Sequence, residues 1–311
     1  MTVSEEKVVD YDVTARIATE AFGSRDVVFS ASRMKWLYER GFGGGSAIVA
    51  AFDGGKKVGQ IALLHLKVQL DGKPVAAIQL VDLFILKAYR SPELVRRIYQ
   101  EVERLCREGK IRLVLTLPNA KSARHNERLL GLRPFLTLPP RIGAGFWRPC
   151  PSNLKFSGRL KSIPRREAID LLSGFVTPVT ENGLHWDAET LFDRMNDPTR
   201  DYAVHATADL LLISSSRRTR GIMHVLLCGF FARPGAAVTS SAVRELVRAA
   251  CRFWKHRIFV YAGVNKSLPG LPGMALPDWF RPPILVQMRD FDTDRPDLRL
   301  DRFQLIDSDF V

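Results

Sequence analysis

The fold is decided by residues 78–92, which read Ile78-Gln79-Leu80-Val81-Asp82-Leu83-Phe84-Ile85-Leu86-Lys87-Ala88-Tyr89-Arg90-Ser91-Pro92. The apolar first part predicts a buried strand, and the basic remainder leads into a helix predicted over residues 92–107. A second apolar strand is predicted over residues 111–117. Because a helix start offers free N–H groups and the positive end of the helix dipole, this order of elements can seat a pyrophosphate.

The preceding segment predicts neighbouring strands of the same sheet. Two apolar runs, Ala47–Phe52 and Val58–Gln69, flank the turn Asp53-Gly54-Gly55-Lys56, and Asp71-Gly72-Lys73 is a further hairpin signal. Strands that alternate with helices in this way predict a mixed sheet flanked by helices. The expected class is therefore α/β, with an α+β mixed sheet.

The order of predicted elements repeats about 150 residues later, as expected of a duplicated domain. Trp36–Arg40 is echoed by Thr190–Arg194, each on a short amphipathic helix. The later elements are matched in the order strand 222–231, helix 238–254, strand 258–261. We therefore expect two domains, residues 1–150 and 151–311, joined by the Pro- and Gly-rich run 137–151.

Composition fits this size and favours anionic partners. The chain has 311 residues, of which 46% are hydrophobic and 25% charged, enough for two packed cores. Its net charge of +13 suits coenzyme A phosphates, a nucleotide-sugar, a cell-wall precursor, tRNA or a membrane surface. The basic residues gather at 155–166, 217–220 and 255–257, and a merely solvated basic surface is the plainer interpretation.

Several classes of protein are disfavoured by the sequence. The start MTVSEEKVVD has no apolar signal-peptide core, and the longest uncharged apolar run is too short to span a bilayer. Four widely spaced cysteines suit reduced, buried thiols in the cytoplasm: Cys106, Cys150, Cys228 and Cys251. The histidines show no metal-site spacing, and the glycines of residues 41–46 lack the Lys-Ser/Thr of a P-loop.

Four short segments resemble the GCN5-related N-acetyltransferase (GNAT) superfamily. Lys35-Trp36-Leu37-Tyr38 looks like an early-helix stretch of many bacterial members, and residues 87–90 are similar to the start of the pyrophosphate loop. Leu117-Pro118-Asn119-Ala120-Lys121-Ser122 and Leu130-Gly131-Leu132-Arg133 resemble the elements after the fifth strand. The match covers residues 30–135 and extends to the second half only through the order of elements. It implies two tandem GNAT-like acyl-CoA N-acyltransferase domains.

The resemblance implies where acetyl-CoA or another acyl-CoA would bind. Backbone N–H groups would hold the pyrophosphate, and the edge of strand 78–86 would pair with the pantetheine amides. Asn119 would contact the cofactor, and Ser122 would cap the next helix or touch the pantetheine. The full expected cofactor set is Leu83, Phe84, Ile85, Leu86, Arg90, Ser91, Glu93, Leu94, Val95, Asn119 and Ser122.

Two departures from the family pattern affect the site. The two glycines of the pyrophosphate loop fall on Glu93 and Val95, which place an anion and a side chain where phosphate would approach. The tyrosine that normally protonates the leaving thiolate is absent, and Asn126 and Glu127 occupy its neighbourhood. In the second half, the loop Ala232–Ala237 takes the place of the pyrophosphate loop. It is either part of a degenerate lobe or, because its small residues permit close approach of the backbone, the working site.

A general base is needed to take a proton from an amine. Asp82 and Glu127 are the predicted catalytic residues, and His224 is a third candidate. Asp82 lies inside an apolar strand, so burial should raise its pKa, unless it serves structurally through a backbone or arginine partner. His224 alternates with apolar residues, which is typical of a core histidine.

Three functions are open on this evidence. The leading hypothesis is acyl transfer from acyl-CoA to a primary amine, with a sugar or cell-envelope precursor as candidate acceptor. The tandem layout and the lost glycines also fit a Fem-type aminoacyltransferase that uses aminoacyl-tRNA. A non-catalytic scaffold or regulator with the same fold is the third. The acceptor, the acyl chain and the oligomeric state are not predicted.

Overall fold

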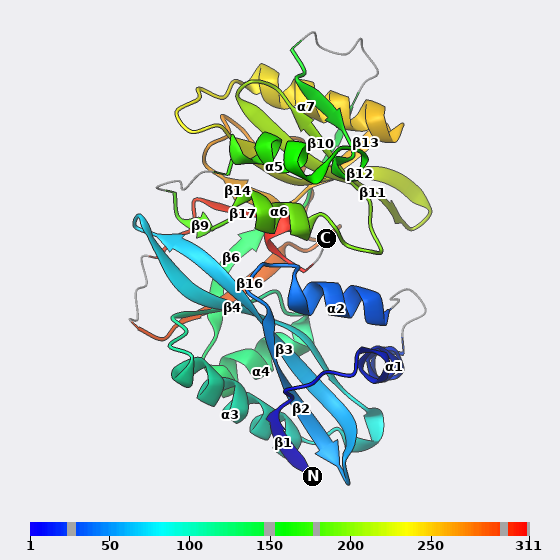
Figure 1. The fold of residues 1–311 in the computed structure, drawn as a ribbon, viewed down its shortest axis with the longest axis vertical. Helices are drawn as coiled ribbons and strands as arrows, with labels where there is room; N and C mark the ends of the chain where they lie inside the picture. The colour runs from blue at the N-terminus through cyan, green and yellow to red at the C-terminus, as the bar shows by residue number, and fades with distance from the viewer. Residues whose placement is uncertain (24–28, 146–152, 177–180, 293–297, 310–311) are drawn as a thin grey trace. The chain divides into compact units, whose positions relative to one another are not determined.

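The computed structural model describes residues 1–23, 29–145, 153–176, 181–292 and 298–309, which form two compact units (Figure 1). Unit 1 consists of Met1–Val68, Pro74–Leu136 and Leu285–Leu298. Unit 2 consists of Gln69–Lys73, Thr137–Ile284 and Arg299–Val311. Each contains a mixed sheet and helices, so the predicted class is confirmed.

The sheet of unit 1 has one parallel pair at its centre. Strands β4 and β5 run parallel from Ala77↔Leu113 to Leu80↔Thr116, whereas β2–β3 and β5–β16 are antiparallel. The order across the sheet is β1 (Thr2–Glu5), β2 (Ser46–Asp53), β3 (Lys56–Leu70), β4 (Lys73–Ile85), β5 (Leu113–Thr116), β16 (Ile284–Asp290) and β6 (Arg133–Leu138).

The helices of unit 1 flank this sheet, with α1 and α2 on one side and α3 and α4 on the other (Figure 1). Their bounds are α1 (Tyr11–Phe22), α2 (Ala31–Glu39), α3 (Pro92–Glu108) and α4 (Ala120–Leu130). Each begins at a side-chain cap, supplied by Asp10, Ser30, Ser91 and Asn119. Helix α3 connects β4 to β5 and buries one apolar face, as its 3.6-residue periodicity predicts.

Unit 2 repeats the plan. Strands β12 and β13 are parallel and are joined by α7 (Ser240–Trp254), whose N-cap is Thr239. The sheet order is β15 (Met274–Ala275), β7 (Arg141–Ala144), β13 (Ile258–Tyr261), β12 (Ile222–Ala232), β11 (Leu210–Thr219), β10 (Tyr202–Ala206) and β8 (Phe156–Gly158). Unit 2 also contains helices α5 (Arg165–Ser173) and α6 (Ala188–Arg194). Its short strands β9 (Gly183–Leu184), β14 (Gly263–Asn265) and β17 (Arg302–Gln304) lie outside the seven-stranded sheet and continue the ladder of β3.

Residues 137–151 were predicted as a linker, and this is wrong for the part that the structure describes. Strand β7 lies inside the sheet of unit 2, antiparallel to β13. The reason is packing, because a Cβ at Gly143 would lie 2.2 Å from the ring of Phe259. Glycine here permits close approach of strand and ring instead of loop flexibility. Residues 146–151 of the predicted linker lie outside the described residues.

Each unit also contains a strand from the other half of the sequence. Strand β16 comes from the second half of the sequence, yet it pairs with β5 in unit 1. Strand β7 takes the corresponding position beside β13 in unit 2. The division of the sequence into halves at residue 150 stays a proposal about the repeat, since the compact units interleave the halves.

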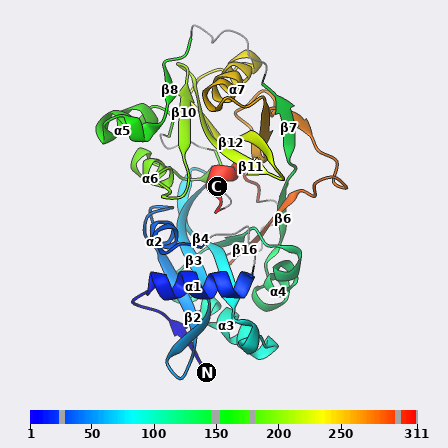
Figure 2. The same ribbon diagram turned by 90° about the vertical axis from the view of Figure 1, so that its right-hand side faces the viewer.

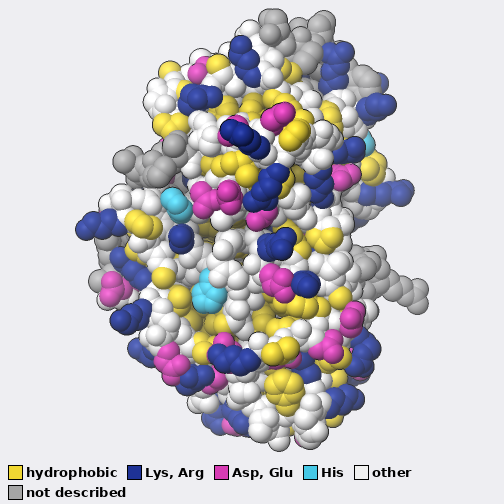
Figure 3. Space-filling view, viewed as in Figure 1, with side chains coloured by type: hydrophobic (Ala, Val, Ile, Leu, Met, Phe, Trp, Pro, Cys, Tyr) yellow, Lys and Arg dark blue, Asp and Glu magenta, His cyan; other side chains and the backbone are white. Residues whose placement is uncertain are grey.

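Three further sequence expectations can be compared with the structure. Cys106, Cys228 and Cys251 are buried free thiols, and burial raises the pKa of each to about 12; Cys150 lies outside the described residues. No helix in the described ranges combines the length and apolarity needed to cross a membrane. The third expectation concerns the basic residues, for which a solvated surface was the plainer interpretation. On the face shown in Figure 3, basic and acidic side chains are interspersed.

Candidate active site

The candidate site of unit 1 begins where β4 leaves its parallel partner. The β4–β5 ladder ends at Leu80↔Thr116, where the Thr116 hydroxyl donates to the Leu80 carbonyl at 3.1 Å. Strand β4 continues to Ile85, and the described residues supply no strand partner on the β5 side of residues 81–85. We call residues 81–85 the open edge of β4.

Asp82 lies on this open edge in an unusual conformation. Its φ of 51° is left-handed, a region that aspartate tolerates better than branched residues do. The buried Tyr38 hydroxyl, from α2, donates to Asp82 Oδ2 at 2.8 Å. Gln60 Nε2, from β3, donates to the Tyr38 oxygen at 2.9 Å. The carboxylate is therefore held in place through Oδ2.

The surroundings of Asp82 favour its protonated form more than those of an exposed carboxyl would. Burial raises the pKa of Asp82, and the hydrogen bond from Tyr38 and the charge of Arg33 only partly oppose this. The expected direction of the shift is confirmed, although the partner is a tyrosine rather than backbone or arginine. Burial and the Asp82 charge raise the pKa of Tyr38 as well, so Tyr38 remains a donor. A carboxylate with a raised pKa is a stronger base than an exposed one.

The start of α3 is less open to phosphate than the sequence pattern implies. Ser91 Oγ accepts from Leu94 N at 3.1 Å, and Pro92 has no N–H. The carbonyl of Ser91 accepts from Val95 N at 3.2 Å. Glu93 forms an ion pair with Arg96 on the exposed first turn. Among the helix-start donors, the N–H groups of Ser91 and Glu93 remain for an anion.

Arg90 is held by backbone carbonyls. Its Nε donates to Ile85 O at 2.9 Å, and its Nη2 donates to Ala21 O at 2.6 Å. These bonds tie the end of β4 to the end of α1 and place an exposed cation beside the start of α3. Of the expected apolar cofactor residues, Leu83 is half-buried, whereas Phe84, Ile85 and Leu86 are buried.

Asn119 caps helix α4, and Ser122 in its first turn bonds back to Asn119. Asn119 Oδ1 accepts from the N–H groups of Lys121 and Ser122, both at 3.0 Å, and Ser122 Oγ donates to Asn119 O at 3.2 Å. Gly131 ends the same helix with a φ of 68°, which explains the Leu-Gly-Leu pattern. Glu127 is exposed on this helix, and no contact in the described ranges joins it to Asp82.

Unit 2 closes the corresponding edge with its own side chains. The β12–β13 ladder ends at Leu227↔Tyr261, and β12 continues to Ala232. Beyond the ladder, Phe230 N donates to Gln304 Oε1 at 2.8 Å, and Gln304 Nε2 donates to Phe230 O at 3.1 Å. A side-chain amide therefore makes the pair of hydrogen bonds that an added strand would make.

Two neighbours complete this closure. Asn265 Nδ2 donates to Phe230 O at 3.1 Å, and the Tyr261 hydroxyl donates to Gln304 Oε1 at 3.3 Å. We call Gln304, Asn265 and Tyr261 the plug; all three are buried. A Cβ at Gly229 would lie 2.8 Å from Ile306, so the chain that carries Gln304 packs tightly on β12.

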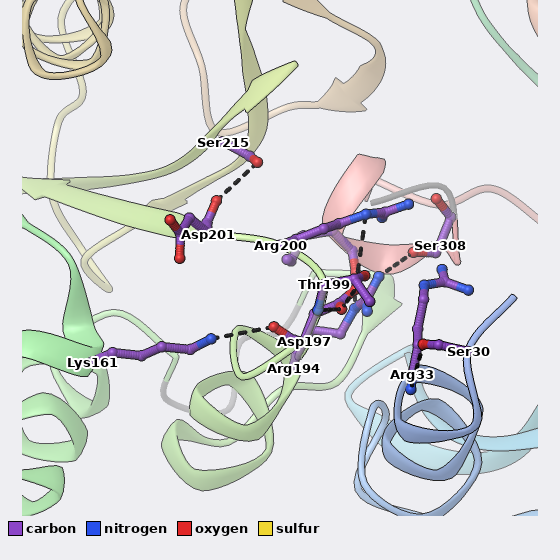
Figure 4. Close-up of polar contacts among 11 residues, drawn as sticks. Ser30, Arg33, Lys161, Arg194, Asp197, Thr199, Arg200, Asp201, Ser215 and Ser308 are labelled. Atoms are coloured by element: carbon purple, nitrogen blue, oxygen red, sulfur yellow. Dashed lines mark hydrogen bonds and ion pairs between the residues drawn. The ribbon is translucent and has the colours of Figure 1, made fainter. Parts of the chain in front are cut away.

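Buried polar contacts hold the chain after the plug in place. Asp307 accepts from Trp186 Nε1 at 2.7 Å and from Gln304 N at 2.7 Å. Figure 4 shows Arg194, which is fully buried, reaching the Ser308 carbonyl. Arg194 Nε also donates to Ile306 O at 3.1 Å. The same view shows Thr199 contacting Asp197 beside this arginine.

The other second-half candidates have structural surroundings. His224 is buried, and burial lowers its pKa, with Ile222 O 3.3 Å from its Nδ1. Arg233 Nε donates to Ala208 O at 2.8 Å, and its guanidinium lies 4.9 Å from the Phe175 ring centroid. These contacts suit the interpretation of unit 2 as a degenerate lobe.

Comparison with known proteins supports the fold. No protein-family model matches the chain, and no curated protein sequence does. A GCN5-related N-acetyltransferase from Anabaena variabilis is similar in structure, with a TM-score of 0.62 at 12% identity over 93% of this chain and 73% of its own. A tandem GNAT protein from the clavulanic acid biosynthesis pathway has a TM-score of 0.56 at 10% identity, over 93% and 98%. The chain has a tandem GNAT-like fold.

The likeness extends to an enzyme with a long-chain donor. Saccharomyces cerevisiae N-myristoyltransferase with bound myristoyl-CoA has a TM-score of 0.59 at 13% identity, over 99% of this chain and 83% of its own. At such identities the comparisons concern the fold alone. They confirm the predicted pair of GNAT-like lobes.

Sequence reasoning missed two residues that position Asp82. Tyr38 was part of a quoted motif but was given no role, and Gln60 was passed over. A signal was present, because Gln60 interrupts an apolar strand and is fully buried. Its Oε1 atom is buried without a hydrogen-bond partner. A buried polar group usually has a partner, so its position beside a candidate site points to a ligand or water.

Proposed function

We propose that the protein is an acyl-CoA-dependent N-acyltransferase whose working site lies in unit 1. The supporting observation is the contrast between β4 in unit 1 and β12, its counterpart in unit 2. The open edge of β4 carries Asp82 fixed by Tyr38, whereas the plug fills the corresponding edge of β12. The acceptor would carry a primary amine, and a sugar or cell-envelope precursor is the candidate class. The protein would act in the bacterial cytoplasm.

The residues suggest a direct transfer. Asp82 Oδ1 would accept a proton from the ammonium group of the acceptor, and the freed amine would attack the thioester carbonyl. The carbonyl oxygen would gain negative charge, which backbone N–H groups of the open edge would stabilise. Collapse breaks the C–S bond, and the thiolate takes the second proton that the attacking nitrogen loses, so that it leaves as free coenzyme A. The first proton passes from Asp82 to solvent. The products are an amide and the thiol, so atoms and charge balance.

The proposed cofactor site uses the open edge and the start of α3. The pantetheine amides would pair with residues 83–86, as in strand addition. The pyrophosphate would lie near Arg90 and the N–H groups of Ser91 and Glu93. Leu94, Val95, Asn119 and Ser122 would line the same region, with their side chains contributing shape or capping.

Calorimetric titration tests this proposal. Acetyl-CoA and free coenzyme A should each bind with one site, and a panel of amines should yield amide product with acetyl-CoA. No heat and no shift in melting temperature at millimolar ligand would overturn it. The same titration on a Gln304→Ala variant distinguishes the lobes, because the open edge of β4 predicts an unchanged stoichiometry.

Glu93 predicts a specific gain in affinity. The Glu93→Gln variant should bind acetyl-CoA about fivefold more tightly, because removing one anion near a pyrophosphate is worth about 1 kcal/mol at an exposed site. Glu108, at the opposite end of the same helix, offers the matched control, and Glu108→Gln should leave the affinity unchanged. Equal affinities in wild type and both variants would place the phosphates away from α3.

The capped start of α3 favours one further candidate, a GNAT-like protein without catalysis. Only two backbone donors remain at the helix start, and Glu93 lies among them. Such a protein would bind coenzyme A weakly and release no product from any amine. The tRNA-dependent alternative predicts a different outcome, a gel shift with tRNA that weakens steeply as salt rises.

A further inference from the structure

A short loop of unit 2 exposes large apolar side chains. Met274 is 76% exposed, Trp279 85% and Phe280 62%. Exposed large apolar residues are uncommon enough in the described chain that three within seven positions form a cluster. Contiguous exposed apolar surface usually marks a binding site.

The loop is held firmly by hydrogen bonds. Strand β15 pairs with β7, and Leu276 N donates to Pro140 O at 2.8 Å. At the tip, the N–H groups of Phe280 and Arg281 both donate to Pro277 O, at 2.9 and 3.1 Å. The Trp279 and Phe280 rings lie 5.9 Å apart, edge to face. Figure 2 shows this loop, in orange, projecting outward beside β7.

Helix α7 carries a basic stripe on the same side. Arg244, Arg248 and Arg252 follow one another at four-residue spacing, so they line one face of the helix. None of the three has an ion pair among the described residues. A groove of about 500 Å³ joins the stripe to the loop, because Arg244, Arg248 and Met274 all line it.

The corresponding helix of unit 1 shows that an unpaired stripe is not required by the fold. Three of the four arginines of α3 form ion pairs with glutamates one turn away, as in Arg104 with Glu101 at 2.6 Å and Arg107 with Glu103 at 2.7 Å, whereas Arg97 donates to the Met1 carbonyl. Helix α7 has one glutamate, Glu245, for its three arginines. The free positive charge therefore belongs to one face of unit 2.

We propose that this face of unit 2 binds the surface of an anionic lipid bilayer. Trp279 and Phe280 would enter the interface, where amphipathic aromatic rings are favoured. Arg244, Arg248 and Arg252 would contact phosphate headgroups. A nucleic acid would engage the arginines but would leave the Met274 and Trp279 surface exposed. A second copy would bring two basic stripes together, which like charges oppose.

Sedimentation with lipid vesicles tests the proposal. The full-length protein should sediment with vesicles of phosphatidylglycerol and phosphatidylcholine, and remain in solution with pure phosphatidylcholine. Binding should weaken as salt rises from 0.05 to 0.5 M, since the Debye length falls below about 10 Å once the salt exceeds 0.1 M and headgroup attraction is then screened. The readout needs no acyl transfer, so it stands or falls independently of the proposed enzyme.

Two variants and two matched controls make the result specific. Arg244→Glu/Arg248→Glu should lower vesicle affinity at least 30-fold. Each lost arginine removes about 1 kcal/mol of attraction, and the new glutamates add repulsion to this loss. Trp279→Ser/Phe280→Ser should lower it at least tenfold. Arg124→Glu/Arg128→Glu makes the same charge change at the same spacing on α4, and Ile222→Ser/Met223→Ser removes another exposed apolar pair. Both control variants should bind vesicles as tightly as the wild type does. All four variants should keep the wild-type melting temperature.

Three outcomes would overturn the proposal. The wild type could fail to sediment with anionic vesicles. The controls could lose as much affinity as the variants, which would indicate attraction by net charge alone. The protein could instead form dimers that Trp279→Ser/Phe280→Ser dissociates, which would make the loop an interface between copies.

Discussion

Replacing Asp82 by asparagine should lower kcat/KM for amine acylation by about 10²- to 10⁴-fold, the usual contribution of a positioned general base. Asparagine keeps the shape of the side chain and can still accept the Tyr38 hydrogen bond, but it cannot take a proton. Steady-state kinetics with acetyl-CoA and the best amine of a panel measure the loss. The affinity for acetyl-CoA should change little, because Asp82 acts on the acceptor.

Asparagine is also the right substitution for the backbone. Asp82 has a φ of 51°, and asparagine tolerates this region as well as aspartate does. The variant should therefore melt at the temperature of the wild type or above. Asp82→Ala serves as the comparison, since it loses the base and adds backbone strain. An Asp82→Asn enzyme with wild-type turnover would show that another group accepts the proton.

The pH dependence should carry the signature of Asp82. Burial raises its pKa above the ordinary value of 3.8, so activity should rise with pH through a midpoint above that value. The folded state then binds more protons than the unfolded state between the two pKa values. Stability contributed by Asp82 is therefore present at low pH and falls as pH rises through this window. Asp82→Asn should remove both the acid limb of kcat/KM and this component of the stability profile.

The local elements could be predicted from sequence because short-range signals fix them. Helix α3 was expected over 92–107 and spans Pro92–Glu108, since a proline, an acid and a 3.6-residue apolar period occur together. The predicted strands on either side are β4 and β5. Asp82 was recognisable because a carboxylate inside an apolar strand is costly without a purpose.

The exchange of strands could not be predicted from such signals. Strand β7 is four residues long and contains Gly143, and its partner β13 lies more than a hundred positions later. Proline and glycine near residue 140 are typical of linkers, whereas here glycine makes room for Phe259. Long-range pairing of short strands leaves little trace in local composition.

The closure of the β12 edge in unit 2 could not be predicted from the sequence either. Gln304 lies near the end of the chain, in a three-residue strand with no periodicity, yet it fills the edge of β12. Sequence could only leave open which lobe holds the working site. We propose unit 1 because an occupied edge cannot pair with a pantetheine arm.

Replacing Gln304 by alanine should destabilise unit 2 strongly. The plug satisfies the buried N–H of Phe230, and the loss of Gln304 would leave that donor unpaired at a cost of about 1–3 kcal/mol. The Tyr261 hydroxyl would lose a partner as well, and the vacated volume adds a cavity term. Together these effects predict a loss of about 3–5 kcal/mol in the free energy of unfolding, measured in urea. Gln100→Ala, on the exposed face of α3, is the matched control and should change it by less than about 0.5 kcal/mol.

The same variant discriminates a structural plug from a site that a cofactor could reclaim. If Gln304 only replaces a missing strand neighbour, acetyl-CoA should stabilise the variant no more than it stabilises the wild type, because unit 1 holds the bound molecule in both. A ligand-dependent rescue of the variant's lost stability, with a second molecule of acetyl-CoA bound in calorimetry, would instead reveal a latent second site on β12. Gln304→Leu separates the two contributions, since leucine fills the volume and leaves Phe230 N unpaired. It should recover the cavity part of the loss and no more.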